Sequence, residues 1–149
     1  MTSAAEAVPT SNASAAWEGK LKDGKGTFKA ESGAFSGPYS FGTRFGGSKG
    51  TNPEELIAAA HAACFSMALS AALEKAGTPV TRVETRASCT LEMVDGAPRI
   101  TRIELSTRGK VPGIDQAAFE KAADAAKQNC PVSKALHGNV DVKLEAKLV

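Results

Sequence analysis

The sequence predicts an α+β fold, in which antiparallel strands pack around one long buried helix. Segments with strand-like alternation of apolar and polar residues come in neighbouring pairs, rather than singly between helices. One long segment without charged side chains is bounded by residues that typically begin and end a helix. The expected order of elements is β-β-β-α-β-β-α-α-β. A chain of 149 residues with 42% hydrophobic side chains suffices for one domain, which we place over residues 15–149.

The first part of the chain is predicted to form a mobile arm followed by three strands. The arm is rich in Ala, Ser and Thr and lacks the basic segment and the long apolar segment of a signal peptide, so we expect a cytoplasmic protein. Alternation predicts the strands, and Asp23-Gly24 is typical of a hairpin turn. The expected elements are an arm over residues 1–14 and strands over residues 17–22, 27–31 and 39–45.

The long helix is predicted from the residues at its ends. Asn52 is a favourable N-cap, and Pro53 suits the first helical position. Glu54 and Glu55 lie where the helix dipole favours negative charge, and Glu55 also completes a capping box with Asn52. Gly77 is expected to end the helix.

Most of this helix carries no charge. Leu56 to Leu73 contains no Asp, Glu, Lys or Arg, and 18 residues are enough to span a membrane. The segment consists largely of Ala and Ser, contains His61, and is followed directly by Glu74 and Lys75. A helix that is apolar on all sides but only weakly hydrophobic is typical of a protein interior. We therefore expect it to be buried in protein, with no membrane as a partner.

The second half of the chain is predicted to begin with a long strand, a turn at Asp95-Gly96 and a returning strand. Asp115 can cap a second helix, and Cys130-Pro131 fits the cap and first position of a short third helix. The expected elements are strands over residues 83–93 and 100–108, a helix from Asp115 to Asn129, a short helix after Cys130, and a strand over residues 140–148.

Charge and cysteine content exclude several classes of protein. The formal net charge is +2, and Lys and Arg are scattered, whereas a nucleic-acid binder needs a concentrated basic face. The three cysteines are too few and too widely spaced for a secreted disulfide framework. No C-x-x-C pair indicates structural zinc, and a zinc site made of Cys64, Cys130, His61 and His137 lacks ligand-pair spacing.

The three cysteines are expected in different environments. Cys89 lies on the apolar face of a predicted strand, where a small buried side chain is the ordinary interpretation. Cys64 lies within the long helix, where a thiol buried alone is neutral and inert. Cys130 lies at a helix start, where the dipole and free N–H groups favour the thiolate. Cys64 and Cys130 suggest a redox pair, because peroxide chemistry needs a thiolate and a second thiol that resolves the sulfenic acid; inert cysteines remain the alternative.

Several short motifs occur along the chain in a specific combination. They are Trp17-Glu18-Gly19, Thr43-Arg44-Phe45, Gly50 to Ile57, His61 to Leu69, Val111 to Asp115 and Asn129 to Ser133. In this combination the chain resembles the OsmC family of osmotically inducible proteins over about residues 15–148. It is more similar to the OsmC subfamily than to the sister organic hydroperoxide resistance proteins, which usually have tyrosine at the position of His61 and an essential arginine earlier in the chain.

The resemblance implies a thiol peroxidase that reduces organic hydroperoxides, and hydrogen peroxide less well, in oxidative or osmotic stress defence. It also implies an intertwined homodimer with two active sites at the subunit interface. By motif match, Cys64 would be the peroxidatic cysteine and Cys130 the resolving one, joined in a disulfide during the reaction. Arg44 would hold and activate the thiolate, and Glu54 would orient Arg44. An external dithiol would reduce the disulfide, and no metal or bound organic cofactor would be needed. Alanine-lined helices around the thiol would favour alkyl or lipid peroxides.

The implied role of Glu54 raises a geometric question. Glu54 and Cys64 are ten positions apart on one predicted helix, which corresponds to about 15 Å along its axis at 1.5 Å per residue. A glutamate side chain does not reach so far. Either the helix breaks, or Glu54 of the partner subunit serves the site of Cys64.

Other interpretations of these residues stay open. The alternative for Glu54 is a first-turn partner of the helix dipole, and the alternative for Arg44 is a solvated charge at a strand end. His61 lies one turn before Cys64, where it either activates the thiol or packs near the site. Two rival functions follow: a dimer that binds an apolar ligand or partner with inert cysteines, and a thiol hydrolase or acyltransferase that uses Cys64 with His61.

Overall fold

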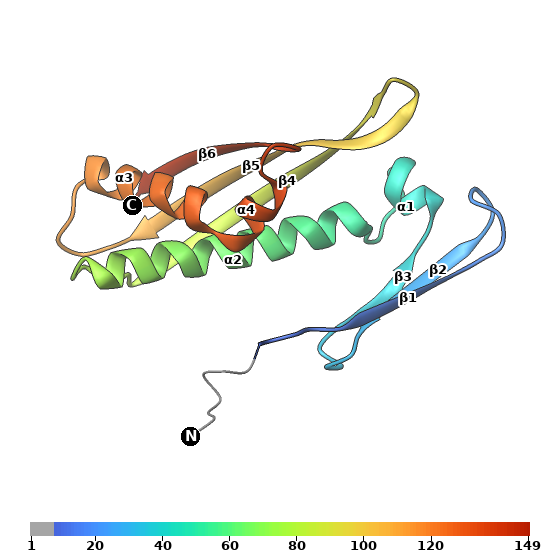
Figure 1. The fold of residues 1–149 in the computed structure, drawn as a ribbon, viewed down its shortest axis with the longest axis horizontal. Helices are drawn as coiled ribbons and strands as arrows, with labels where there is room; N and C mark the ends of the chain where they lie inside the picture. Colours follow the sequence, from blue (N-terminus) through green and yellow to red (C-terminus); the bar gives the residue numbers. More distant parts are fainter. Residues whose placement is uncertain (1–7) are drawn as a thin grey trace. The chain divides into compact units, whose positions relative to one another are not determined.

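The computed structural model describes residues 8–149, which form two compact units, one ending at Asn52 and one starting at Pro53 (Figure 1). Residues 1–7 of the expected arm lie outside the described residues. The first unit contains β1 (Ala13–Glu18), β2 (Lys25–Ala30), β3 (Ser36–Tyr39) and α1 (Phe41–Phe45). The second contains α2 (Pro53–Lys75), β4 (Arg82–Val94), β5 (Ala97–Lys110), α3 (Gln116–Asn129), α4 (Pro131–Leu136) and β6 (Asp141–Leu148).

The first unit is an antiparallel sheet with the strand order β1-β2-β3. β1 begins at Ala13, so that Ala13 and Ser14, placed in the expected arm, pair with β2. β1 ends at Glu18 and not at residue 22, because Gly19 takes a left-handed conformation with φ 93° that terminates the extended chain. The rings of Trp17 and Tyr39 pack against each other, with their centroids 5.5 Å apart.

The prediction of a strand over residues 39–45 was wrong. β3 ends at Tyr39, and the chain then turns into the short helix α1. The cause is a reciprocal capping box: the Thr43 backbone N–H donates to Ser40 Oγ at 3.2 Å, and the Ser40 backbone N–H donates to Thr43 Oγ1 at 2.9 Å. Arg44 therefore lies in the last turn of a helix, exposed, with its guanidinium 5.3 Å from the ring centroid of Phe45.

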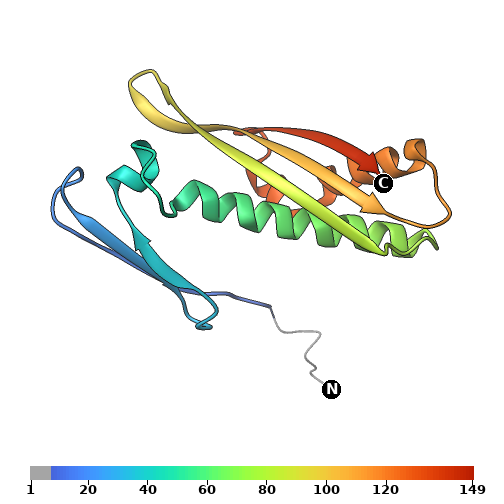
Figure 2. The ribbon, with the colours of Figure 1, turned by 180° about the vertical axis from the view of Figure 1, so that it is seen from behind.

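The second unit has two layers. β4 and β5 form an antiparallel hairpin, and β6 pairs with β5 in the parallel direction, which gives the order β4-β5-β6. The helices α2, α3 and α4 lie over one face of this sheet, and Figure 2 shows the strands from the opposite side. Fully buried side chains meet between the layers. They include Phe65 and Leu69 of α2, Ile103 of β5, and Phe119 and Ala123 of α3.

The predicted helix boundaries of this unit are confirmed. α2 begins at Pro53, and Gly77, with φ 86°, follows its last turn. Asp115 caps α3, because its side chain accepts from the Ala118 backbone N–H at 2.9 Å. The parallel pairing of β6 departs from the expectation of antiparallel strands; the chain returns to the edge beside β5 through α3 and α4.

α2 is long and apolar enough to span a membrane by length and composition alone. In this fold, Phe65, Leu69 and Leu73 instead form a stripe that packs in the core against the sheet. On the other side of the helix, Ala63 and Met67 are exposed, and Met67 retains 75% of its accessible surface. Within one chain, α2 is therefore buried along one side only, and an uncharged side of it faces outward.

Gly109 of β5 gives a test of this core. A Cβ atom at Gly109 would collide with the ring of Phe119, which is fully buried. Gly109→Ala is expected to lower the free energy of unfolding by about 1–3 kcal/mol, because a packed ring has to move. Urea unfolding followed by circular dichroism measures this change. Ser106→Ala, at an exposed position of the same strand, is the control and should change stability by less than about 0.5 kcal/mol. Equal stability of the two variants would contradict the packing.

Candidate functional site

Two thiols from distant parts of the chain meet in the second unit. Sγ of Cys64, on α2, lies 3.1 Å from Sγ of Cys130, and both cysteines are free. Cys130 is completely buried and Cys64 is half-buried. A disulfide has an S–S distance of about 2.05 Å, so a small displacement suffices to join them. The structure thus brings together the two cysteines singled out from the sequence.

The position of Cys130 follows from the break between α3 and α4. Its backbone N–H donates to the Ala126 carbonyl at 2.8 Å and completes α3, while its own carbonyl accepts from the Lys134 N–H at 3.0 Å. Pro131 occupies the first position of α4 and supplies no donor. One residue therefore ends one helix and begins the next, which holds its side chain toward α2.

The environments of the two sulfurs favour the charged form to different extents. Burial raises the pKa of Cys64, and its hydrogen bond with Cys130 raises it further. Burial also opposes the thiolate of Cys130, but its hydrogen bond with Cys64 and the polar groups of Ser133 and Val132 lower its pKa below the usual value. The pKa of the two thiols is thus displaced in opposite directions, upward for Cys64 and downward for Cys130.

A buried histidine extends this cluster. His61, one turn before Cys64 on α2, is fully buried, and its Nε2 lies 2.8 Å from Oγ of Ser133 on α4. Its Nδ1 is buried and has no hydrogen-bond partner among the described residues. Because Ser133 engages Nε2, the structure gives no Cys64–His61 hydrogen bond of the kind that a thiol hydrolase would use. Sequence reasoning missed Ser133, whose only local signal is its place three residues after Cys130.

The third cysteine, Cys89, lies on β4 and packs against the core. Burial raises the pKa of Cys89, and the negative charge of Glu54 raises it further. Cys89 is half-buried, and both burial and the charge of Glu54 favour its neutral form, so it is a poor nucleophile. This environment agrees with the interpretation of Cys89 as a small apolar side chain of the strand.

Glu54 and Arg44, unlike Cys130, are not placed beside Cys64 by the fold of the second unit. Glu54 is 6% exposed in the first turn of α2, and α2 runs unbroken from Pro53 to Lys75. The ten positions between Glu54 and Cys64 thus span about 15 Å of continuous helix, more than a glutamate side chain reaches. Arg44 belongs to the unit that ends at Asn52. The possibility that the helix breaks between Glu54 and Cys64 is therefore removed.

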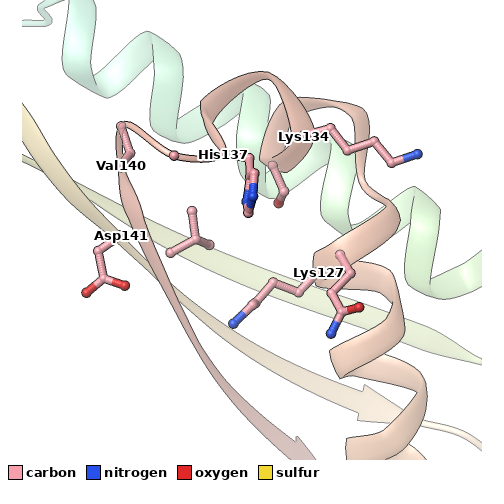
Figure 3. A pocket seen from close by; sticks show the side chains of 9 residues that line it. Lys127, Lys134, His137, Val140 and Asp141 are labelled. Carbon is pink, nitrogen blue, oxygen red and sulfur yellow. The ribbon is translucent and has the colours of Figure 1, made fainter.

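An open pocket lies beside the cluster. It has a volume of about 710 Å³, is bounded by α3, α4 and β6, and reaches Ser133. In Figure 3, Lys127 extends toward this pocket and Lys134 extends away from it. Its lining includes His137 and Asp141 but neither Cys64 nor Cys130. Over residues 8–149, no group of three or more His, Cys, Asp or Glu side chains is arranged to hold a metal ion.

His61 predicts a dependence of stability on pH. Burial lowers its pKa below the ordinary value of 6.5. Below about pH 6.5 the unfolded chain therefore binds more protons at this residue than the folded protein, so the contribution of neutral His61 is complete above that pH and is lost as the pH falls. The loss is at most about 1.4 kcal/mol per pH unit.

Urea unfolding at about pH 7.5 and about pH 5.5 measures this dependence. We expect His61→Gln to lose less stability between these pH values than the unsubstituted protein does. His137→Gln, at an exposed position, is the matched control and should behave like the unsubstituted protein. An identical loss in His61→Gln and the unsubstituted protein would contradict the prediction.

Comparison with known proteins places the chain in a family. The family model described as OsmC-like protein matches residues 46–145. Peroxiredoxin OsmC of Escherichia coli is 50% identical over 132 residues, which cover 88% of this chain and 92% of that protein. Organic hydroperoxide resistance protein OhrB of Bacillus subtilis is 37% identical over 68% of this chain and 73% of its own length.

Solved structures agree with this placement. The crystal structure of OhrB of Bacillus subtilis has a TM-score of 0.73 at 30% identity and covers 91% of this chain and 98% of its own. An organic hydroperoxide resistance protein OsmC from Legionella pneumophila has a TM-score of 0.78 at 26% identity, with coverage of 97% and 100%. The predicted α+β class is thereby confirmed, and the chain belongs to the OsmC family.

Proposed function

We propose that this chain is a cysteine-based thiol peroxidase that reduces organic hydroperoxides to alcohols, in defence against oxidative or osmotic stress. The observation that carries the proposal is the pair of free thiols, Cys64 and Cys130, with sulfurs 3.1 Å apart. Relatives named peroxiredoxin OsmC and organic hydroperoxide resistance protein support this enzyme class.

The proposed reaction starts at Cys64. Its thiolate attacks one oxygen of the peroxide, the O–O bond breaks, and the alkoxide leaves as an alcohol after taking a proton. Cys64 is then a sulfenic acid. The thiolate of Cys130 attacks the sulfur of Cys64, hydroxide leaves as water after taking a proton, and a disulfide forms. An external dithiol reduces the disulfide and restores both thiols, so no metal or bound organic cofactor enters the reaction.

The first step requires a thiolate at Cys64, although burial and the hydrogen bond with Cys130 raise the pKa of its thiol. A nearby cation would favour that form. We assign this role to Arg44, which would also polarise the peroxide, and we assign to Glu54 the orientation of Arg44.

The active unit is proposed to be a homodimer in the cytoplasm. The uncharged outer side of α2, with Ala63 and Met67 exposed, is suited to contact a second copy. Because Glu54 does not reach Cys64 along its own helix, the Glu54 that serves each site would come from the partner subunit. Neither nucleic acid nor membrane is a partner in this proposal.

Mass spectrometry tests the proposal. The reduced protein is treated with one equivalent of cumene hydroperoxide, and a loss of about 2 Da that maps to a Cys64–Cys130 disulfide is expected. Cys89→Ser is the control and should show the same loss. Unchanged thiols would contradict the peroxidase and favour the rival, a protein that binds an apolar ligand or partner. Comparable rates with hydrogen peroxide and cumene hydroperoxide would contradict the preference for organic substrates.

A further inference from the structure

We propose that the open pocket between α3, α4 and β6 binds a small organic carboxylate, and that Lys127 holds the negative charge of this ligand. The pocket has a volume of about 710 Å³, which lies in the range of small-molecule sites. All of its lining residues belong to the second unit. The site is separate from the two sulfurs, because neither Cys64 nor Cys130 lines it.

Lys127 supplies a positive charge inside the pocket. It lies in the last turn of α3 and is half-buried. In Figure 3 its side chain extends into the pocket, whereas that of Lys134 extends away from it. Within residues 8–149, no carboxylate forms an ion pair with Lys127. A partly desolvated cation without a counter-charge in the protein attracts an anionic ligand.

Asp141 is the one carboxylate that the described residues place in the lining, and it is already paired. Its Oδ2 lies 3.2 Å from Nζ of Lys143. Because side chains alternate along a strand, the exposed Asp141 and Lys143 share one face of β6, and the half-buried Val142 lies on the other. The charge of Lys127 is therefore left for a ligand. A single ammonium group matches a monoanion such as a carboxylate, whereas a phosphate dianion calls for a second cation.

The rest of the lining suits a short apolar chain. Val140 and Val142 are half-buried and pack against the hydrophobic core. Ser133 is 8% exposed, so the pocket reaches a buried polar side chain, whose Oγ lies 2.8 Å from Nε2 of His61. Ligand sites typically combine apolar walls with a few polar groups. Together with the cation, these walls indicate a carboxylate on a short hydrocarbon chain.

Lys127 also has an ordinary structural role. A cation in the last turn of a helix interacts favourably with the helix dipole, and α3 has Lys127 at that place. This interaction contributes to stability but involves no anion in the pocket. A binding measurement therefore separates the two roles, and a stability measurement does not.

Titration of the reduced full-length protein with sodium octanoate at constant ionic strength tests the proposal. The ring signals of histidine in NMR spectra report binding, because the chain has two histidines, of which His137 lines the pocket and His61 contacts Ser133. We expect saturable shifts with a dissociation constant in the millimolar range. Lys127→Gln should weaken binding by about tenfold, because a charged hydrogen bond is lost. Lys127→Arg retains the charge and should bind within about threefold of the unsubstituted protein.

Lys134→Gln is the matched control. It removes the same charge from a neighbouring helix, at a side chain that extends away from the pocket (Figure 3). An exposed charge contributes little to binding at a distance, so octanoate should bind within about twofold of its affinity for the unsubstituted protein. Equal weakening in Lys127→Gln and Lys134→Gln would trace the effect to overall charge and overturn the proposal.

Two further ligands make the test independent of any substitution. Octanol has the same chain without the charge and should bind at least about tenfold more weakly than octanoate. Equal binding of octanol would leave an apolar pocket without recognition of an anion. Equal binding of inorganic phosphate would remove the assignment to a carboxylate, and unchanged His137 signals with octanoate would remove the site. None of these measurements involves peroxide, so failure of this proposal and failure of the proposed peroxidase are distinguishable.

Discussion

Cys64→Ser is expected to lower the rate of organic hydroperoxide reduction by at least about a thousandfold, because it removes the nucleophile that starts the reaction. The fold should persist, since serine is close to cysteine in size and Cys64 is only half-buried. Consumption of cumene hydroperoxide in the presence of a dithiol measures the rate, and circular dichroism checks the fold.

The other two cysteines serve as comparisons for this variant. Cys130→Ser should still react once, leaving a sulfenic acid at Cys64 that excess peroxide oxidises further. Cys89→Ser should turn over like the unsubstituted protein, because the neutral form of Cys89 is favoured by burial and by Glu54. Substantial activity in Cys64→Ser together with inactivity in Cys130→Ser would reverse the roles assigned to the two thiols. The comparison is informative because the pKa of Cys64 is raised and that of Cys130 is lowered.

Local signals predicted the long helix well and one strand poorly. α2 begins at Pro53 and is followed by Gly77 because capping residues act on their immediate neighbours. Residues 39–45 were predicted to form a strand. The capping box between Ser40 and Thr43 starts a helix there instead, and the segment is too short for its helical period to be visible in the sequence.

The direction of β6 and the side-chain contacts of the candidate site depend on residues far apart in the sequence, so local patterns did not predict them. Val142 of β6 lies beside Ile103 of β5 in parallel register, and alternation alone is the same for a parallel and an antiparallel partner. The bridge from His61 to Ser133 joins residues 72 positions apart. Cys64 and Cys130 were singled out by helix position and motif, but the meeting of their sulfurs depends on the packing of α4 against α2.

Mixed dimers give the strongest test of shared active sites. Glu54→Gln alone is expected to reduce activity by about 10- to 100-fold, the effect of losing a charged hydrogen-bond partner. A dimer purified with one Cys64→Ser chain and one Glu54→Gln chain would contain one intact site if Glu54 acts across the interface. It should then recover about half of the unsubstituted activity. Two tags, one on each chain, allow this dimer to be purified and its peroxide consumption to be measured.

The reciprocal dimer is the control that makes the result unambiguous. It pairs an unsubstituted chain with a chain carrying both Cys64→Ser and Glu54→Gln. If Glu54 acts across the interface, the only remaining Cys64 faces the glutamine of the doubly substituted chain, and activity should be as low as in Glu54→Gln. If Glu54 acted within its own chain, this dimer would keep half of the activity and the first dimer would be as inactive as Glu54→Gln. Because about 15 Å of unbroken helix separates Glu54 from Cys64, we expect the first pattern.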